Sequence, residues 1–467
     1  MRPYVVLVSM LSLALAPTLT RVSAQEYYAD VRPLIEENCV GCHSDNGVAF
    51  SMEDPEKTYE RRRAISRMVE SRRMPPWLAE AGHQDYVEDL SLSEEQVETL
   101  HWWAAADFPK GEPRERTIIR PRRTAFKADV TVDIMPGKSY LPSQDRDDDY
   151  RCFIVDWPGE TPEYITGFRT VPGNDQVAHH TVVYSAEPGL RDRFHELDEA
   201  EDGPGYECFG GALPDRLGKR AERAAYDARY PNGVRELNRG NFWLAHWAPG
   251  MFGQPFPEGT GILMEPGGVM VVQMHYYTPE APGESDAGTT MEFQVAEVVD
   301  RPAFHLPMTY NPWFDDDGGM VIPPGEQATY EVSETLGDWL GYIAKVTQVD
   351  EDEIEGLEIH SANLHMHAFG HSGEITLTDK NRRKEVLLSI PRWDLAWQRD
   401  FMFAEPKIFA TDDLDETRIA VECTYENPTA EAVHGGLGSF DEMCFNFSYV
   451  AVQTGEKGPV VGSSPNR

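Results

Sequence analysis

The sequence predicts a mainly β protein, in which a small all-α domain precedes two β domains. Near the N-terminus, apolar residues recur at the spacing of an amphipathic helix, as in 27–38. From about residue 124 onward, short strand-like segments alternate with Gly- and Pro-rich turns, which is typical of an antiparallel β-sandwich or jelly roll. The chain has 467 residues, which is enough for two or three domains.

The first 24 residues have the pattern of a secretory signal peptide. A positive start at Arg2 precedes the apolar run 5–16 and a small-residue cleavage site at 22–24. The run is too short to span a bilayer, and no other stretch of the sequence is long and apolar enough. We therefore expect an exported protein, periplasmic or extracellular, with no membrane span.

Acidic residues far outnumber basic ones. The chain carries 79 Asp and Glu against 42 Lys and Arg, a formal net charge of −37. Such a surface repels nucleic acid and anionic lipid headgroups, so we expect neither as a partner. The charge by itself names no substrate, because a solvated acidic surface explains it equally well.

The helical domain is expected over residues 25–112. Its first helix covers 27–38, and a second helix begins at Ser91 as the N-cap and reaches about Ala106. Residues 113–125 are rich in Pro and Arg and predict a linker.

Two β domains are expected after the linker, over 126–299 and 300–454, followed by a disordered tail over 455–467. A helix is expected over 217–229, inside the first β domain. The clearest strand signals are at 181–184, 269–277, 374–378, 385–390, 419–426 and 446–452.

Cys39, Cys42 and His43 form a Cys-x-x-Cys-His run, which is the attachment motif of a c-type haem. The two thiols bond covalently to the haem, and the adjacent imidazole reaches the iron. We therefore expect one covalently bound haem c, with His43 as its proximal ligand.

Met74 is the sixth haem ligand that we expect. Two prolines follow it and favour an extended loop that can hold a thioether over the haem. Methionine ligation raises the haem reduction potential relative to bis-histidine ligation, which suits an electron carrier. Met52, Met68 and His83 are the alternatives. Residues 25–112 thus resemble a small monohaem cytochrome c.

Four cysteines remain after the haem motif, and three disulfide pairings are open to them. An exported protein favours disulfides over free thiols. We favour Cys152 with Cys208 and Cys423 with Cys444, because each pair then falls within one expected β domain.

Three histidines of the first β domain are candidate metal ligands, namely His179, His180 and His275. His179 and His180 are adjacent at the start of an expected strand, where regular geometry points them to opposite faces. One metal can use both only if the strand ends or bulges there. Taken singly, a histidine pair is more often a surface feature, and a buried histidine such as His275 is more often structural.

His365, His367 and Met443 form a second candidate set, in the second β domain. A strand presents residues two apart on one face, so the two imidazoles suit chelation of one metal. Histidine ligands would also suit zinc. The soft thioether of Met443 instead favours copper, above all Cu(I).

The order of these motifs resembles the copper type II ascorbate-dependent monooxygenase family. The resemblance covers about residues 149–452. It rests on the His pair at 179–180, the Gln-Met-His-Tyr run at 273–276, the His-Met-His element at 365–367 and the Asp-Glu-Met-Cys run at 441–444. Cys423 and Cys444 also stand where the family has a disulfide.

The resemblance implies two jelly-roll domains that hold two copper ions on facing sides of a solvated gap. The set of His179, His180 and His275 would hold an electron-transfer copper. The second set would be catalytic and would hold the copper at which O2 reacts with a substrate C–H bond. The oxygen chemistry would belong to the metal, and the protein would fix its ligands.

Three positions depart from the peptide-amidating members of the family. Those members carry Arg two residues before the His-x-His element, where this chain has Asn363. They carry Asn and Tyr after the methionine ligand, where this chain has Phe445 and Phe447. The replaced groups clamp a peptide carboxylate, so we expect a more apolar or aromatic substrate. Both phenylalanines also fit as core residues of a strand.

We therefore expect an exported copper monooxygenase that hydroxylates a C–H bond of a small organic substrate with O2. The expected electron donor is ascorbate or a redox protein, and we expect the fused haem to deliver the electrons to copper. The alternatives are a non-catalytic haem and copper electron-transfer protein, a zinc hydrolase, and a haem-based sensor or interaction module on an inert β scaffold. Metal analysis and oxygen-dependent product formation distinguish the monooxygenase from the first two.

Overall fold

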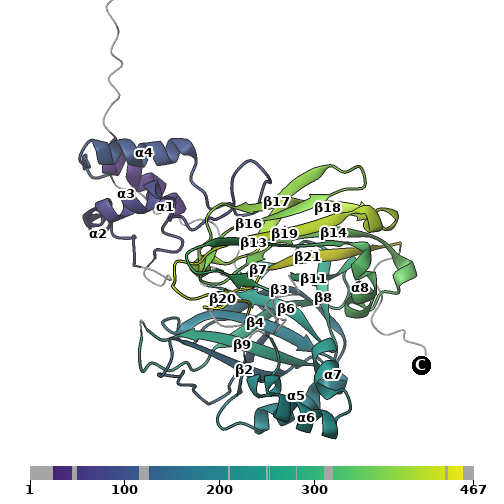
Figure 1. The fold of residues 1–467 in the computed structure, drawn as a ribbon. Coiled ribbons are helices and arrows are strands. Elements are labelled where there is room, and N and C mark those ends of the chain that lie inside the picture. Colours follow the sequence, from purple (N-terminus) through teal and green to yellow (C-terminus); the bar gives the residue numbers. More distant parts are fainter. Residues whose placement is uncertain are drawn as a thin grey trace, which may run out of the picture. The chain divides into compact units, whose positions relative to one another are not determined.

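The structure is a computed structural model that describes residues 25–44, 50–114, 126–208, 211–248, 251, 253–279, 281–309, 319–436 and 440–455 (Figure 1). The expected signal peptide, residues 115–125 of the expected linker and residues 456–467 of the expected tail lie outside the described residues. Two compact units divide the chain: the first contains Met1–Pro75 and Leu92–Pro121, and the second contains Pro76–Ser91 and Arg122–Arg467.

The first unit is helical. Its elements are η1 (Tyr27–Val31, a π-helix), α1 (Arg32–Asn38), α2 (Pro55–Glu60), α3 (Arg62–Glu70) and α4 (Glu94–Ala105). Tyr27 stacks on Trp103 with ring centroids 5.8 Å apart, and Phe108 meets Trp103 edge to face at 4.9 Å. These aromatic rings form the centre of its core, together with Ile35 and Leu100.

The N-cap of α4 is Ser93, and our prediction of Ser91 was wrong. The Ser93 hydroxyl accepts a hydrogen bond from the Gln96 backbone, and the Gln96 side chain accepts one from the Ser93 backbone. Starting the helix here also places buried Leu92 before the cap and Val97 in its first turn, and both pack in the core. A start at Ser91 would have put half-exposed Leu90 in the place of Leu92.

The second unit contains all the strands that the described residues form. Those of its first half are β1 (Val130–Asp133), β2 (Asp148–Asp156), β3 (Glu163–Val171), β4 (Ala178–Ala186), β5 (Tyr206–Glu207), β6 (Asn241–Trp247), β7 (Gln254–Pro255), β8 (Thr260–Met264), β9 (Val269–Tyr277) and β10 (Thr290–Ala296). Those of its second half are β11 (Arg301–Thr309), β12 (Val321–Ile322), β13 (Gln327–Thr335), β14 (Ile354–Ala362), β15 (Leu364–His365), β16 (Gly370–Thr378), β17 (Lys384–Ile390), β18 (Phe401–Ala410), β19 (Arg418–Glu426), β20 (Val433–His434) and β21 (Phe445–Thr454).

One long sheet runs through both halves of this unit in the order β1-β10-β3-β8-β11-β21-β14-β18. A five-stranded sheet, β5-β2-β9-β4-β6, faces its first half, and a four-stranded sheet, β13-β19-β16-β17, faces its second half. Each facing pair encloses its own apolar core, one around Phe293 and Met274 and the other around Ile359 and Val421. The prediction of a mainly β protein is confirmed, and the layers are consistent with a β-sandwich.

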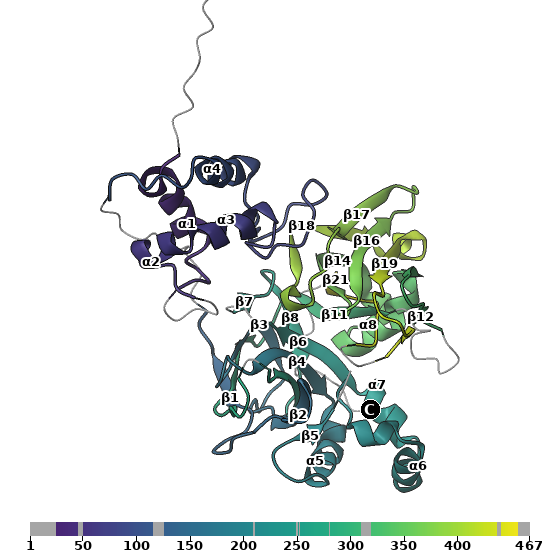
Figure 2. The ribbon, with the colours of Figure 1, turned by 60° about the vertical axis from the view of Figure 1, so that its left-hand side comes forward.

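Helices cover the outside of the five-stranded sheet. α5 (Arg191–Glu199) lies beside β2, α7 (Gly233–Arg239) contacts β6, and α6 (Arg220–Arg229) packs on α7 (Figure 2). Phe194 and Leu237 from these helices are fully buried against Val271 of β9. The expected helix at 217–229 is present as α6, preceded by the 3₁₀ turn η3 (Asp215–Gly218). α8 (Leu340–Thr347) belongs to the second half.

Residues 76–91, which we expected within the helical domain, pack against the second half of the β unit. The Tyr86 hydroxyl donates to the Leu387 carbonyl at 2.7 Å, and Trp77 meets Phe401 edge to face at 5.0 Å. The helix following this segment returns to the first unit. Among the described residues, no helix combines the length and the apolar character needed to cross a membrane.

Candidate metal centres

A bulge in β4 brings His179 and His180 together. β4 pairs with β9 so that Ala178 faces Tyr276 and His180 faces His275, and the register shifts between the two pairs. The shift removes the strict alternation that would send adjacent side chains to opposite faces. The bulge that His179 and His180 need in order to bind one metal together is therefore present.

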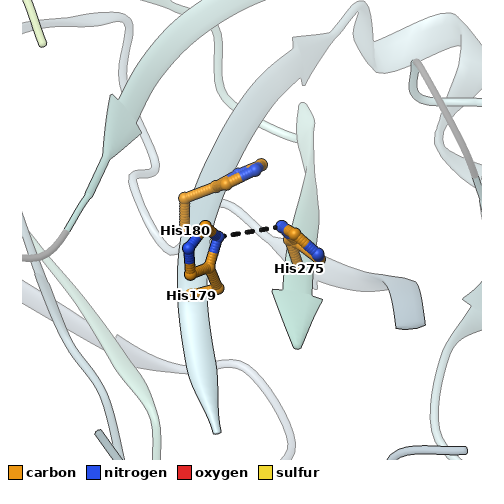
Figure 3. Close-up of side chains that lie close together, drawn as sticks. All are labelled: His179, His180 and His275. Atoms are coloured by element: carbon orange, nitrogen blue, oxygen red, sulfur yellow. Dashed lines mark hydrogen bonds between the residues drawn. The ribbon is translucent and has the colours of Figure 1, made fainter. Parts of the chain in front are cut away.

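His179, His180 and His275 converge in space (Figure 3). One nitrogen of each ring can be chosen so that all three lie within 4.8 Å of one another. The Nδ1 atoms of His179 and His275 are 3.2 Å apart, and the His180 ring centroid is 4.5 Å from that of His275. Residues separated by 95 positions in the chain thus form a compact nitrogen cluster.

Two neighbours fix the orientation of His275. Its Nε2–H donates to the Asp148 carboxylate at 2.8 Å, so Nδ1 carries the lone pair that faces His179. The Tyr150 ring stacks on the imidazole at 4.2 Å with an interplanar angle of 5°. Both residues come from β2, which pairs with β9 along its whole length.

Burial keeps these imidazoles neutral. It lowers the pKa of His179 and drives the pKa values of His180 and His275 well below their usual range. Neutral imidazoles with exposed lone pairs are the form that binds a transition metal. The donor set therefore fits a copper ion.

His365 and His367 present their lone pairs on the Nε2 side. His365 Nδ1 donates to the Gln398 side-chain oxygen, and His367 Nδ1 donates to the Asp441 carbonyl at 3.2 Å. The two ring centroids are 5.2 Å apart. Burial lowers the pKa of His365 to about 4, so it is neutral at pH 7.

Met443 is buried and lies in the loop that reaches His367. The carboxylate of its neighbour Glu442 accepts the backbone N–H of His367 at 2.8 Å and that of Phe369 at 2.6 Å. The Met443 carbonyl accepts the Tyr425 hydroxyl at 2.8 Å. Met443 is thus the next residue after Glu442, whose carboxylate bonds directly to the His367 backbone.

The two histidine sets lie within electrostatic reach of each other. After burial and its two partners His275 and His179, the rings that lower the pKa of His180 are His365 and His367. His367 also contributes to the lowered pKa of His275. Both candidate centres therefore belong to one region of the second unit.

Aromatic rings extend from His365 along β21. The Phe445 ring centroid is 6.2 Å from that of His365, and Phe445 stacks on Phe447 at 5.5 Å. Phe447 is buried and stacks on Trp243 at 3.9 Å. Asn363 is also buried, and its amide donates to the Asp400 carboxylate at 2.9 Å. This region offers aromatic surface where the peptide-amidating enzymes carry polar groups.

Both favoured disulfide pairs are present in the structure. Cys152 on β2 bonds to Cys208 with Cα atoms 5.7 Å apart, and Cys423 on β19 bonds to Cys444 with Cα atoms 5.9 Å apart. The second bond follows Met443 directly and ties its loop to the four-stranded sheet.

The haem motif occupies one turn after α1. The backbone N–H groups of Cys42 and His43 both donate to the Cys39 carbonyl, and neither cysteine takes part in a disulfide. His43 Nδ1 donates to the Phe50 carbonyl at 2.9 Å, which makes Nε2 its lone-pair nitrogen. Two thiols and an oriented imidazole on one turn fit a covalently bound haem.

Met74 follows α3 at the end of the first unit. Its backbone N–H donates to the Met68 carbonyl at 3.1 Å. Its role as the sixth haem ligand stays a prediction.

Sequence reasoning missed the residues that orient the histidines. Asp148, Gln398 and Glu442 each bond to a candidate ligand, and the first two lie 127 and 33 positions from their partners. Of the three, Glu442 alone carried a sequence signal, because it stands next to Met443.

Comparison with known proteins gives an independent view of the second unit. Residues 319–455 match the family model described as copper type II ascorbate-dependent monooxygenase, C-terminal domain. Human dopamine beta-hydroxylase is 25% identical over 337 residues, which is 69% of this chain and 46% of that protein. The horse enzyme of the same name is 24% identical, over 71% of this chain and 48% of that protein. MOXD1 homolog 2 of Drosophila melanogaster is 21% identical, over 76% of this chain and 46% of that protein.

The chain thus spans about half the length of the curated relatives it matches. The matched C-terminal domain contains His365, His367 and Met443. The second unit is thus similar to copper type II ascorbate-dependent monooxygenases over the residues that match.

Proposed function

We propose that this chain is an exported copper-dependent monooxygenase that hydroxylates a C–H bond of a small organic substrate with O2. The observation that carries the proposal is the pair of oriented imidazole sets in one region of the β unit. In one set His275 is oriented by Asp148, and in the other His365 is oriented by Gln398. The similarity to dopamine beta-hydroxylases supports the same reaction class.

In this proposal His179, His180 and His275 hold an electron-transfer copper through their lone-pair nitrogens. His365, His367 and Met443 hold the copper at which the substrate reacts, where the thioether favours Cu(I). When bound, the two copper ions supply the one-electron steps and the activation of O2. Asp148, Gln398 and the Asp441 carbonyl keep the imidazole tautomers in the form that binds metal.

The residues around the second set bind and orient the substrate. Phe445 gives an aromatic surface 6.2 Å from the His365 ring, and Asn363 is engaged by Asp400. Neither offers the cation that would pair with a carboxylate. We therefore propose an apolar or aromatic substrate in place of a peptide with a free C-terminus.

The Cys39-Cys42-His43 turn holds a covalent haem c in this proposal, with Met74 as the sixth ligand. A haem attached to Cys39 and Cys42 and ligated by His43 would supply one-electron transfer between a donor, ascorbate or a redox protein, and the copper sites. Removing the haem should then abolish turnover with a protein donor. Unchanged turnover of the haem-free variant with that donor would contradict the haem role.

The experiment that tests the enzyme activity is metal and haem quantitation followed by a substrate screen under 18O2. We expect two copper ions and one haem per chain, and a product with one oxygen atom from O2. A His367→Ala variant should lose product while His371→Ala, at an exposed histidine, keeps it. Two bound copper ions without any oxygen-dependent product would favour the non-catalytic electron-transfer protein. Bound zinc with anaerobic activity would favour a hydrolase.

A further inference from the structure

A second polar cluster lies beside the His365 set, and the proposed function gives no role to its histidine. It contains His246 of β6, Asn363 and Asp400. His246 Nε2 is 3.3 Å from the Asp400 carboxylate, and the Asn363 amide donates to the same carboxylate at 2.9 Å. The cluster joins the five-stranded sheet to the second half of the unit.

The tautomer of His246 follows from its neighbours. The Trp243 indole N–H donates to His246 Nδ1 at 3.4 Å, so Nδ1 carries the lone pair and Nε2 carries the proton. The Nε2–H then points at Asp400. A ring in this tautomer is a hydrogen-bond donor to a carboxylate, and this geometry does not suit a metal ligand.

A small cavity opens next to this cluster, and a third histidine lines it. The cavity has a volume of about 30 Å³ and is lined by His246, His305, Asp400 and Tyr449 among mostly apolar neighbours. His305 is 3% exposed, and neither of its ring nitrogens makes a well-aligned hydrogen bond among the described residues; the Leu244 backbone lies near the ring as a poorly aligned partner. A buried imidazole without well-aligned partners is costly, because its donor and acceptor have both lost water.

The volume decides what the cavity can hold. One water needs about 10–15 Å³ measured in this way, so there is room for about two waters and none for a substrate. The waters would have polar partners in His305, Asp400 and the Tyr449 hydroxyl, which also bonds to Thr260 at 2.9 Å. Two to four partners per water are what a stable buried water requires.

The cavity is close to the proposed reactive centre. His246 is one of the groups that influence the pKa of His365, after burial and Gln398. Asn363, which contacts both His246 and Asp400, lies two residues before His365. The polar cluster therefore connects the cavity with the strand that carries a proposed ligand.

The proposed reaction needs protons at a buried site. Hydroxylation follows RH + O2 + 2 e⁻ + 2 H⁺ → ROH + H2O, in which a one-electron donor such as ascorbate supplies the electrons. The C–H bond is replaced by a C–O and an O–H bond, and the second oxygen atom leaves as water. Two protons must reach the reacting oxygen atoms in each turnover.

We propose that this cavity binds ordered water and that the water and Asp400 pass protons toward the reactive centre, with His246 holding Asp400 and His305 holding the water in place. The inference rests on the proposed function and adds a pathway to it. His305 is a positioning residue for the water, because it lines the cavity beside His246 and Tyr449.

The test has two parts. The first is a high-resolution crystal structure of the metal-free protein, in which we expect water density within hydrogen-bond distance of His305. The second compares His305→Leu, which fills a similar volume without polar atoms, with His305→Gln, which keeps a donor and an acceptor. His371→Leu, at an exposed histidine, is the control.

In the copper- and haem-loaded enzyme we expect His305→Leu to lower kcat by on the order of tenfold, with KM and copper content unchanged, since relayed acid–base steps contribute at least this much. The solvent deuterium isotope effect on kcat should rise, and His305→Gln should recover most of the loss. Tyr449→Phe, which removes one water partner, gives a second reading should His305→Leu fail to fold.

A dry cavity in the wild-type crystal would overturn the inference. So would a kcat and an isotope effect within twofold of wild type in both His305→Leu and Tyr449→Phe. Failure of the proposed function would look different, because the wild-type enzyme would then give no oxygen-dependent product. The crystal structure of the metal-free protein tests the presence of water in the cavity whether or not the enzyme is active.

Discussion

The hydrogen bond from His275 to Asp148 gives the sharpest test of the first metal centre. The bond is 2.8 Å long, the Asp148 side chain is 24% exposed and the His275 side chain is 4% exposed, so water screens the pair only in part. Replacing Asp148 by Leu removes the acceptor that holds the proton on Nε2 and lets the proton move to Nδ1, the atom that faces His179. A hydrogen bond to a charged group contributes about 1.5–3 kcal/mol, which corresponds to roughly a 10–100-fold change in copper affinity.

Anaerobic copper titration of the purified protein measures this change. We expect one of two copper sites to weaken in Asp148→Leu, with a smaller effect in Asp148→Asn, whose amide oxygen still accepts a hydrogen bond. The exposed Asp145→Leu is the matched control and should bind copper like wild type. Histidine-selective ¹⁵N NMR of the metal-free variant should show His275 protonated on Nδ1. Wild-type affinity at both sites in Asp148→Leu would refute the tautomer argument.

Three further outcomes are expected. Burial lowers the pKa of His305 from 6.5 to about 4, so in this pH range the unfolded chain binds a proton that the folded chain excludes. The free energy of unfolding should therefore fall by up to about 3 kcal/mol as the pH drops from 6.5 to 4. Urea titrations of His305→Leu at the two pH values should lack this loss. The Cys152–Cys208 disulfide spans 56 positions, so Cys152→Ser should lower the free energy of unfolding by about 4 kcal/mol in urea titrations, and a loss below 1 kcal/mol would count against it. Cys39→Ala should leave haem attached by one bond or none, which the haem absorbance of denatured, acetone-extracted protein would reveal as a loss.

The strands were predictable because their pattern is local. β9 covers the predicted 269–277, and β17 and β19 each begin one residue before the predicted segment. Alternation and turn residues lie within a few positions of one another, so they can be read from the sequence alone. The pairing of β11 with β8 is parallel and joins two halves of the chain, and no local signal encodes it.

The sequence proposed the candidate ligand sets as lists of residues, and of these His179, His180 and His275 converge in the structure, whereas the residues that orient the imidazoles could not be predicted. His365 and His367 are two positions apart, so a strand places both on one face. His179 and His180 are adjacent, so they can share a metal only where the strand bulges. Asp148 has no fixed spacing to its partner, because the contact arises only when β2 pairs with β9. The N-cap of the last helix of the first unit failed for a related reason, since two serines offer similar local signals and core packing decides between them.

The chemistry of the second centre depends on which groups are already occupied. Phe447 is buried under Trp243, so it fills the interior, and Phe445 is the residue of the pair that presents surface near His365. Asn363 donates its amide to Asp400, so the carboxylate of Asp400 has a partner. Neither Phe445 nor Asn363 offers a cation to a substrate carboxylate, and the nearby Asp400 carboxylate adds negative charge, in agreement with the proposed apolar or aromatic substrate. The same arrangement that disfavours an acidic substrate leaves Asp400 facing the small cavity of His305, which ties substrate selection and the proposed proton pathway to one side chain.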